Sequence, residues 1–233
     1  MIEIRDLTVS YDEKPVLWDI DLQLEKGLLW AIVGPNGAGK STLIKTMLDF
    51  IKPVTGTISF GGQSYQKVQK QIAYVPQRTS VDWNFPTTVY DVVLMGRYGH
   101  AGILKPLSSK DKKVAYEACE KLGITHLKDR QIAQLSGGQQ QRVFLARALC
   151  QEAEIYIMDE PFSGVDIKTE NAINELFKEL KQNNKTVIVV HHDLESVAKT
   201  FDSVVLLNRQ VIAHGPIDRE FTSENIEKTY RNA

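Results

Sequence analysis

The chain has few cysteines, no long apolar run and no excess of charge of either sign. Its 233 residues include only Cys119 and Cys150, which lie far apart and form no C-x-x-C pair. This spacing suggests a reducing compartment and no metal knuckle. The formal net charge of −1 gives no electrostatic basis for binding nucleic acid or a membrane surface. No run of about 18 apolar residues is present, so no segment is expected to span a membrane.

Length and composition allow one large domain, or one domain with a subdomain. An apolar content of 42% is sufficient for a core. The N-terminus lacks the basic and apolar regions of a signal peptide, so a cytosolic protein is expected unless a partner tethers it.

One stretch fits the phosphate-binding pattern G-x-x-x-x-G-K-[ST]: Gly34-Pro35-Asn36-Gly37-Ala38-Gly39-Lys40-Ser41-Thr42. A short apolar run precedes it, and apolar residues on one helical face follow it, so a strand, a glycine loop and a helix are predicted. The unpaired N–H groups at the start of a helix, with its dipole, attract phosphate. Lys40 is expected to reach the β- and γ-phosphates and the Ser41 hydroxyl to ligate Mg²⁺. The plainer alternative is a glycine turn before a helix.

Asp159 and Glu160 directly follow a buried-strand run at 155–158. Ligands bind at the carboxyl edges of strands in open α/β sheets. Asp159 is therefore suited to hold Mg²⁺, directly or through water, and Glu160 to polarise the attacking water. A solvated acidic turn is the alternative.

Other polar or aromatic residues also close predicted strands. Gln77 follows a strand at 72–75, where its amide oxygen suits Mg²⁺ or a water, although a loop amide is the plainer interpretation. His191 and His192 follow a strand at 186–190, where a histidine suits a γ-phosphate oxygen or a structural role. Tyr11 closes the opening strand and is either a strand-end tyrosine or a platform for an adenine.

Two further regions carry structural predictions. Apolar and polar residues alternate from position 18 to 24, with the apolar ones at Trp18, Ile20, Leu22 and Leu24. This alternation predicts a half-buried strand with these four side chains on its apolar side. Residues 87–150 contain no clear strand, and caps are expected at Thr87 or Thr88, at Ser108 or Ser109, and at Ser136. The simplest interpretation of that region is an α-helical insertion in an α/β protein.

These motifs, in this order, resemble the ATPase subunit of an ATP-binding cassette (ABC) transporter, over essentially the whole chain. The most diagnostic motif is the family signature, which is matched letter for letter by Leu135-Ser136-Gly137-Gly138-Gln139. The resemblance implies an α/β fold with a P-loop NTPase (RecA-like) ATP-binding core and an antiparallel β subdomain. Residues 1–86 and 154–233 would form this core, and residues 87–153 the inserted α-helical signature subdomain.

The resemblance also implies ATP and Mg²⁺ as cofactors, and it assigns roles by motif. Glu160 corresponds to the catalytic glutamate, Gln77 to the Q-loop residue, and His192, followed by Asp193, to the switch histidine. Ser41, Gln77 and Asp159 would ligate the metal. The nucleotide would be bound by the P-loop residues 34–42, by Tyr11, by Asp166 of the D-loop, and by Ser136, Gly137, Gly138 and Gln139. The D-loop has Gly164-Val165 where the family often has Ala-Leu, which leaves its contacts less defined.

The family mechanism implies two kinds of partner. Two copies pair head to tail, so that each ATP lies between the P-loop of one chain and the signature of the other. ATP holds the dimer closed, and hydrolysis and phosphate release let it reopen. This cycle is coupled to rocking of separate membrane permease subunits, with this chain on the cytoplasmic face of the membrane.

A narrower resemblance lies in the segment from Val81 to Gly99, together with residues 131–134 and 191–194. It is similar to manganese, zinc and iron importers of bacteria, which implies an extracytoplasmic solute-binding protein as an indirect partner. Trp83 and Phe85 are candidate anchors for the permease, although a subdomain core would equally use them. Three alternatives stay open: an ATPase of another ABC transporter, a soluble ABC-type ATPase, and a nucleotide-gated interaction module.

Overall fold

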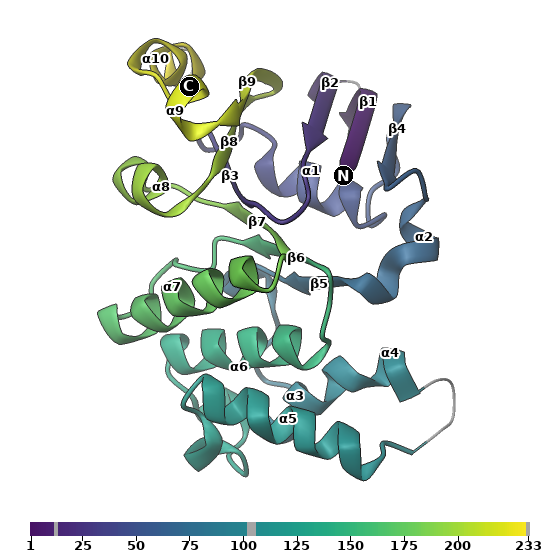
Figure 1. Cartoon of the computed structure of the whole chain (residues 1–233), viewed down its shortest axis with the longest axis vertical. Helices are drawn as coiled ribbons and strands as arrows, with labels where there is room; N and C mark the ends of the chain where they lie inside the picture. Colours follow the sequence, from purple (N-terminus) through teal and green to yellow (C-terminus); the bar gives the residue numbers. More distant parts are fainter. Residues whose placement is uncertain (12–13, 102–105, 232–233) are drawn as a thin grey trace. The chain divides into compact units, whose positions relative to one another are not determined.

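The computed structural model describes residues 1–11, 14–101 and 106–231 (Figure 1). The chain divides into two compact units, one of residues 1–69 and 177–233 and the other of residues 70–176. We call them unit 1 and unit 2. No helix in the described ranges is both long and apolar enough to cross a membrane.

Unit 1 contains two groups of strands. The strands β7, β3, β8 and β9 lie in this order, with β3 parallel to both of its neighbours and β9 antiparallel to β8. Every residue of β3 and β7 is buried, which explains why both read as continuous apolar runs. The other group is antiparallel, in the order β2-β1-β4. The elements of unit 1 are β1 (Ile2–Ser10), β2 (Pro15–Leu24), β3 (Leu29–Val33), α1 (Lys40–Met47), β4 (Thr55–Phe60), α2 (Tyr65–Val68), β7 (Thr186–Val190), α8 (Leu194–Thr200), β8 (Ser203–Asn208), β9 (Gln210–Pro216), α9 (Ile217–Glu220) and α10 (Ser223–Tyr230).

Strand β2 corrects one prediction, because Trp18 does not share the buried side of the strand. The Trp18 side chain is 61% exposed, whereas Leu17 is fully buried. The pairing of β1 with β2 shifts register here, and Asp19 has a positive φ of 52°. This irregularity interrupts the strict alternation of side chains that the sequence pattern assumed.

Unit 2 is mainly helical, as expected for residues 87–150. Apart from an isolated bridge between Thr88 and Gln131, the described residues 87–101 and 106–150 contain no strand. Helices α3, α5 and α6 pack against one another (Figure 1). The elements are β5 (Ile72–Val75), α3 (Val89–Leu94), the 3₁₀ turn η3 (Met95–Arg97), α4 (Tyr98–Ala101), α5 (Ser109–Lys121), α6 (Gly137–Cys150) and β6 (Ile155–Asp159), with α7 (Ile167–Gln182) beginning in unit 2. Strands β5 and β6 are parallel.

The helix caps of unit 2 agree with the sequence. Thr88, Ser108 and Ser136 each accept a hydrogen bond from a backbone N–H of the first turn, and Ser108 and Ser136 complete capping boxes. After α5, Gly123 takes a positive φ of 64° and ends the helix. The Ser136 cap fixes where α6, which carries the signature, begins.

Candidate nucleotide-binding site

The glycine loop joins β3 to α1, as the strand–loop–helix pattern predicted. Lys40, the first residue of α1, is only 6% exposed and folds back over the loop. Its Nζ donates hydrogen bonds to the carbonyl oxygens of Gly34 and Pro35, both at 2.8 Å. A Cβ added at Gly37 would meet nothing within 4 Å, so the loop is open at this residue. The loop therefore forms a cradle with a cation at its base.

Neighbouring backbone determines the shape of this cradle. A Cβ at Gly34 would lie 1.9 Å from the carbonyl oxygen of Leu207, so only glycine fits there. Gly39 has a φ of 92° and lies against the Leu17 side chain. The turn between β8 and β9 adds a hydrogen bond from the Arg209 N–H to the Ala38 carbonyl at 3.0 Å. The loop is thus supported by β2 and by the end of β8.

Tyr11 lies beside the start of α1. Tyr11 is 58% exposed, and its hydroxyl is 3.3 Å from Oγ1 of Thr42. An exposed ring held next to a phosphate loop is suitably located to stack on the base of a bound nucleotide.

The two histidines after β7 have different surroundings. His191 is buried, its Nε2 is hydrogen-bonded to the Ser196 hydroxyl, and its ring packs against Phe201 at a centroid distance of 5.8 Å. Burial lowers the pKa of His191. His192 is exposed. The structural role therefore suits His191, and this supports the choice of His192 as the candidate switch residue.

In unit 2, the acidic pair lies at the carboxyl end of β6. Asp159 is its last residue and is 2% exposed, whereas Glu160 is half-buried with a positive φ of 52°. The Gln77 amide nitrogen donates a 2.9 Å hydrogen bond to Oε2 of Glu160. The structure thus brings together two residues that only the family resemblance links. The Gln77 side chain holds the carboxylate of Glu160 in one orientation.

The signature forms the N-terminus of α6. The Ser136 hydroxyl accepts from the Gln139 N–H at 3.3 Å, and the Gln139 side chain accepts from the Ser136 N–H at 2.9 Å. The Gln139 side chain is therefore used in the cap. Ser136 is exposed, so its hydroxyl lies at the surface at the positive end of the helix.

Asp166 has a local partner as well. Its Oδ1 accepts a 2.8 Å hydrogen bond from the Thr169 N–H, in the first turn of α7. Hydrogen bonding to Thr169 is the main reason why the pKa of Asp166 is lowered. The family resemblance assigns Asp166 to the nucleotide, and in the structure Asp166 also caps the helix after the D-loop.

Each unit thus holds part of the predicted set. Unit 1 contains the P-loop, Tyr11 and His192, and unit 2 contains Gln77, Asp159, Glu160, the signature and Asp166. Sequence reasoning missed Arg78, whose guanidinium lies over the signature glycine Gly137. A basic residue directly after Gln77 was the one available signal.

The two candidate docking aromatics also differ. The indole of Trp83 is half-buried, packs edge-on against Phe144 with ring centroids 4.9 Å apart, and donates from Nε1 to the Arg78 carbonyl at 2.8 Å. Phe85 is 60% exposed. Trp83 therefore packs within unit 2, whereas Phe85 presents an apolar surface to solvent.

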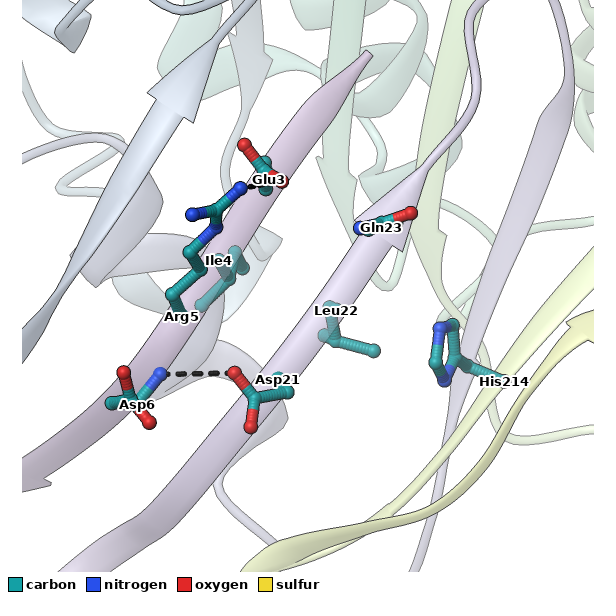
Figure 2. Close-up of a pocket in the computed structure, with 8 residues that line it drawn as sticks. All are labelled: Glu3, Ile4, Arg5, Asp6, Asp21, Leu22, Gln23 and His214. Carbon is teal, nitrogen blue, oxygen red and sulfur yellow. Dashed lines mark hydrogen bonds and ion pairs between the residues drawn. The ribbon is translucent and has the colours of Figure 1, made fainter.

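A cavity of about 500 Å³ lies elsewhere in unit 1, along β1 and β2 with His214 of β9 at its edge (Figure 2). It contains none of the predicted site residues. Two of its lining residues, Asp6 and Asp21, form an acidic group with Asp19. Carboxylate oxygens of the three lie within 4.8 Å of one another, and all three residues are exposed. An exposed acidic group alone gives no indication of a bound ion.

Comparison with known proteins decides the family. The profile of the family described as ABC transporter matches residues 17–163. The chain belongs to the ABC transporter family. ATP binding and hydrolysis are the activity of this domain, and the described elements are those of its α/β P-loop NTPase fold.

Among the relatives of this ABC ATPase, a manganese transport system ATP-binding protein of Bacillus subtilis is 56% identical, over 98% of this chain and 92% of the relative. A zinc transport system ATP-binding protein of Treponema pallidum is 53% identical, over 98% and 86%. A solved structure of an ATP-binding cassette of an ABC transporter in its ADP conformation superposes with a TM-score of 0.83 at 25% identity, over 100% of this chain and 99% of that one.

Proposed function

We propose that this chain is the ATP-hydrolysing subunit of an importer for a divalent metal ion, with manganese as the first candidate and zinc or iron as the next. The observation that carries this proposal is the identity of 56% and 53% to subunits named for manganese and zinc transport, each over 98% of the chain. These names give the transported metal, and import is part of the proposal.

In this proposal, the P-loop cradle holds the triphosphate of ATP and Tyr11 stacks on its adenine. Lys40 already occupies the base of the cradle, hydrogen-bonded to loop carbonyls. A bound triphosphate would replace those carbonyls as the partner of Nζ. The hydroxyl, amide and carboxylate oxygens of Ser41, Gln77 and Asp159 are the donor types that Mg²⁺ prefers. The ion, when bound, neutralises charge on the phosphates.

Glu160 is the candidate general base for the attacking water, with His192 toward the γ-phosphate. Gln77 orients Glu160 through the 2.9 Å hydrogen bond between their side chains. Because the carboxylate is already held by an amide donor, its position is set before the water arrives.

The catalytic unit in this proposal is a head-to-tail dimer on the cytoplasmic face of the membrane. Ser136 and the N–H groups of Gly137 and Gly138 would bind the γ-phosphate held by the second copy, with Asp166 near the interface. The α-helical subdomain of residues 87–153 and the loop with Trp83 and Phe85 would receive the permease. A solute-binding protein would select the metal outside the cell.

Substitution of the catalytic glutamate tests the ATPase half of the proposal. Glu160→Gln keeps the shape of the side chain and removes its basicity. Loss of a general base lowers turnover by about 10²–10⁴, and the variant should accumulate as a dimer with Mg²⁺ and ATP. The measurements are phosphate release and size-exclusion chromatography with light scattering. The matched control is Glu120→Gln, an exposed residue of unit 2. Turnover in Glu160→Gln equal to that of the parent would remove Glu160 from this role.

The transport half of the proposal is tested in living cells. A deletion strain on chelated medium should be rescued by manganese at lower concentration than by other metals, and the chain should co-purify with a polytopic membrane protein. Equal rescue by every metal would overturn the choice of a metal importer. Absence of a membrane partner would favour the soluble ABC-type ATPase.

A further inference from the structure

Arg78 occupies a position at which three motifs meet within unit 2. It directly follows Gln77 and begins the short 3₁₀ turn Arg78–Ser80. Its guanidinium lies over the first residue of α6: a Cβ at Gly137 would be 3.2 Å from both Cζ and Nη1 of Arg78. A Cβ at Gly164 of the D-loop would be 3.9 Å from Nη2. The Arg78 side chain, which comes from the Q-loop, therefore lies beside both the signature and the D-loop.

The second signature glycine is packed in a similar way. A Cβ at Gly138 would lie 3.0 Å from Oγ1 of Thr169 and 3.9 Å from Cγ of Asp166. Gly137 and Gly138 thus serve as close-contact positions inside the chain, because any larger residue would push Arg78 or Thr169 away. The start of α6 is held on one side by the Q-loop and on the other by the start of α7.

The backbone of Arg78 extends this contact toward the surface. Its carbonyl accepts the Trp83 indole N–H at 2.8 Å, and the Trp83 ring packs against Phe144 of α6. The cation of Arg147 lies 4.3 Å from the centroid of Phe144, and Arg147 donates to the Tyr74 carbonyl in β5 at 3.0 Å. The Trp83 loop is therefore held by contacts with α6 and with Arg78, and the Arg78 side chain lies over the first turn of α6.

We propose that Arg78 is a positioning residue that links the Trp83 loop to the signature glycines and to the D-loop. It acts through the backbone at Gly137 and has no direct part in the chemistry. The inference rests on the proposed function, in which the first turn of α6 binds the γ-phosphate held by the second copy. A guanidinium near a helix N-terminus is repelled by the helix dipole. Phosphate bound at that terminus would remove this repulsion, so nucleotide binding and the Arg78 contact strengthen each other.

Trp83 itself provides the reporter for the test. The chain has three tryptophans, so Trp18→Phe with Trp30→Phe leaves Trp83 as the single indole. Glu160→Gln is added to hold the nucleotide-bound dimer. Arg78→Met is compared in this background with Arg130→Met, which removes an exposed arginine of the same unit. Mg²⁺ and ATP are titrated while Trp83 emission and dimer mass are recorded.

In the background protein and in Arg130→Met, dimer formation should change the Trp83 emission. In Arg78→Met, we expect the ATP concentration for half-maximal dimer formation to rise about tenfold, as for the loss of one contact by a charged group. At saturating ATP the Arg78→Met dimer should form without the Trp83 change. A merely structural loss would lower the melting temperature and would not separate dimer formation from Trp83 emission.

Two results would overturn the proposal. One is an equal Trp83 response in Arg78→Met and the background protein at saturation. The other is a background dimer that forms with no Trp83 response at all. If the background protein does not dimerise with Mg²⁺ and ATP, the head-to-tail dimer of the proposed function fails, and this inference fails with it.

Discussion

Arg97, a buried arginine of the helical region, offers a sharp test of the structure. Arg97 is 4% exposed and its guanidinium makes hydrogen bonds to three groups. Nε donates to Oδ1 of Asp111 at 2.9 Å, and Nη1 donates to the Cys150 carbonyl at 2.9 Å and to Oε2 of Glu152 at 2.5 Å. The Arg97 side chain thus connects η3 by hydrogen bonds to the start of α5 and to the end of α6, the helix that carries the signature. Arg97→Met removes these bonds while keeping an apolar stem of similar length.

The expected cost follows from what each partner loses. Breaking a buried ion pair by removing one partner costs about 3–5 kcal/mol. Asp111 retains hydrogen bonds from the N–H and the hydroxyl of Ser108 at 2.9 Å and 2.6 Å. The Glu152 side chain is 56% exposed and regains water, so its pair contributes little. We therefore expect a loss near the lower limit, about 3 kcal/mol.

Thermal unfolding measures this loss. For a chain of this size, 1 kcal/mol shifts the melting temperature by roughly 2–4 °C, so Arg97→Met should melt about 6–12 °C below the parent. Arg130→Met, which changes an exposed arginine of the same unit, is the matched control. A melting temperature of Arg97→Met within about 2 °C of the control would refute the network as a stabilising feature.

Other predictions concern pH, thiol chemistry and the P-loop. Hydrogen bonds from Ser108, aided by the Arg97 pair, lower the pKa of Asp111 to about 2. The ionised Asp111 carboxylate therefore adds its full share to the free energy of unfolding above the unfolded pKa of about 3.9, and this share is lost as pH falls toward 2. The free energies of unfolding of Asp111→Asn and the parent, measured in urea, should converge at low pH. Burial raises the pKa of Cys119 to about 11 and of Cys150 to about 12, so a thiol reagent at pH 8 should label neither before unfolding; rapid native labelling would contradict this. Gly34→Ala should abolish ATP binding measured by calorimetry, because its Cβ would lie 1.9 Å from a carbonyl oxygen; unchanged affinity would refute the loop geometry.

Local chemistry was readable from the sequence. The caps at Thr88, Ser108 and Ser136 depend on residues three positions apart, and each is confirmed. Asp49 takes the left-handed conformation after the P-loop helix, with a φ of 61°, which aspartate tolerates better than most residues. The P-loop and the signature are contiguous stretches of sequence, and they were sufficient to recognise the resemblance to the family. The roles of the individual site residues stay predictions.

Contacts between distant segments were decided only by the tertiary structure. Trp18 was expected on the buried side of its strand, and a register shift placed it in solvent. Nothing in the sequence near Gly34 indicates that the Leu207 carbonyl lies against it. The sequence spacing between Arg78 and Gly137 likewise does not predict that the Arg78 guanidinium lies over Gly137. The physical reason is that periodicity reports which face of an element is buried, whereas the partner on that face depends on how elements far apart in the chain pack together.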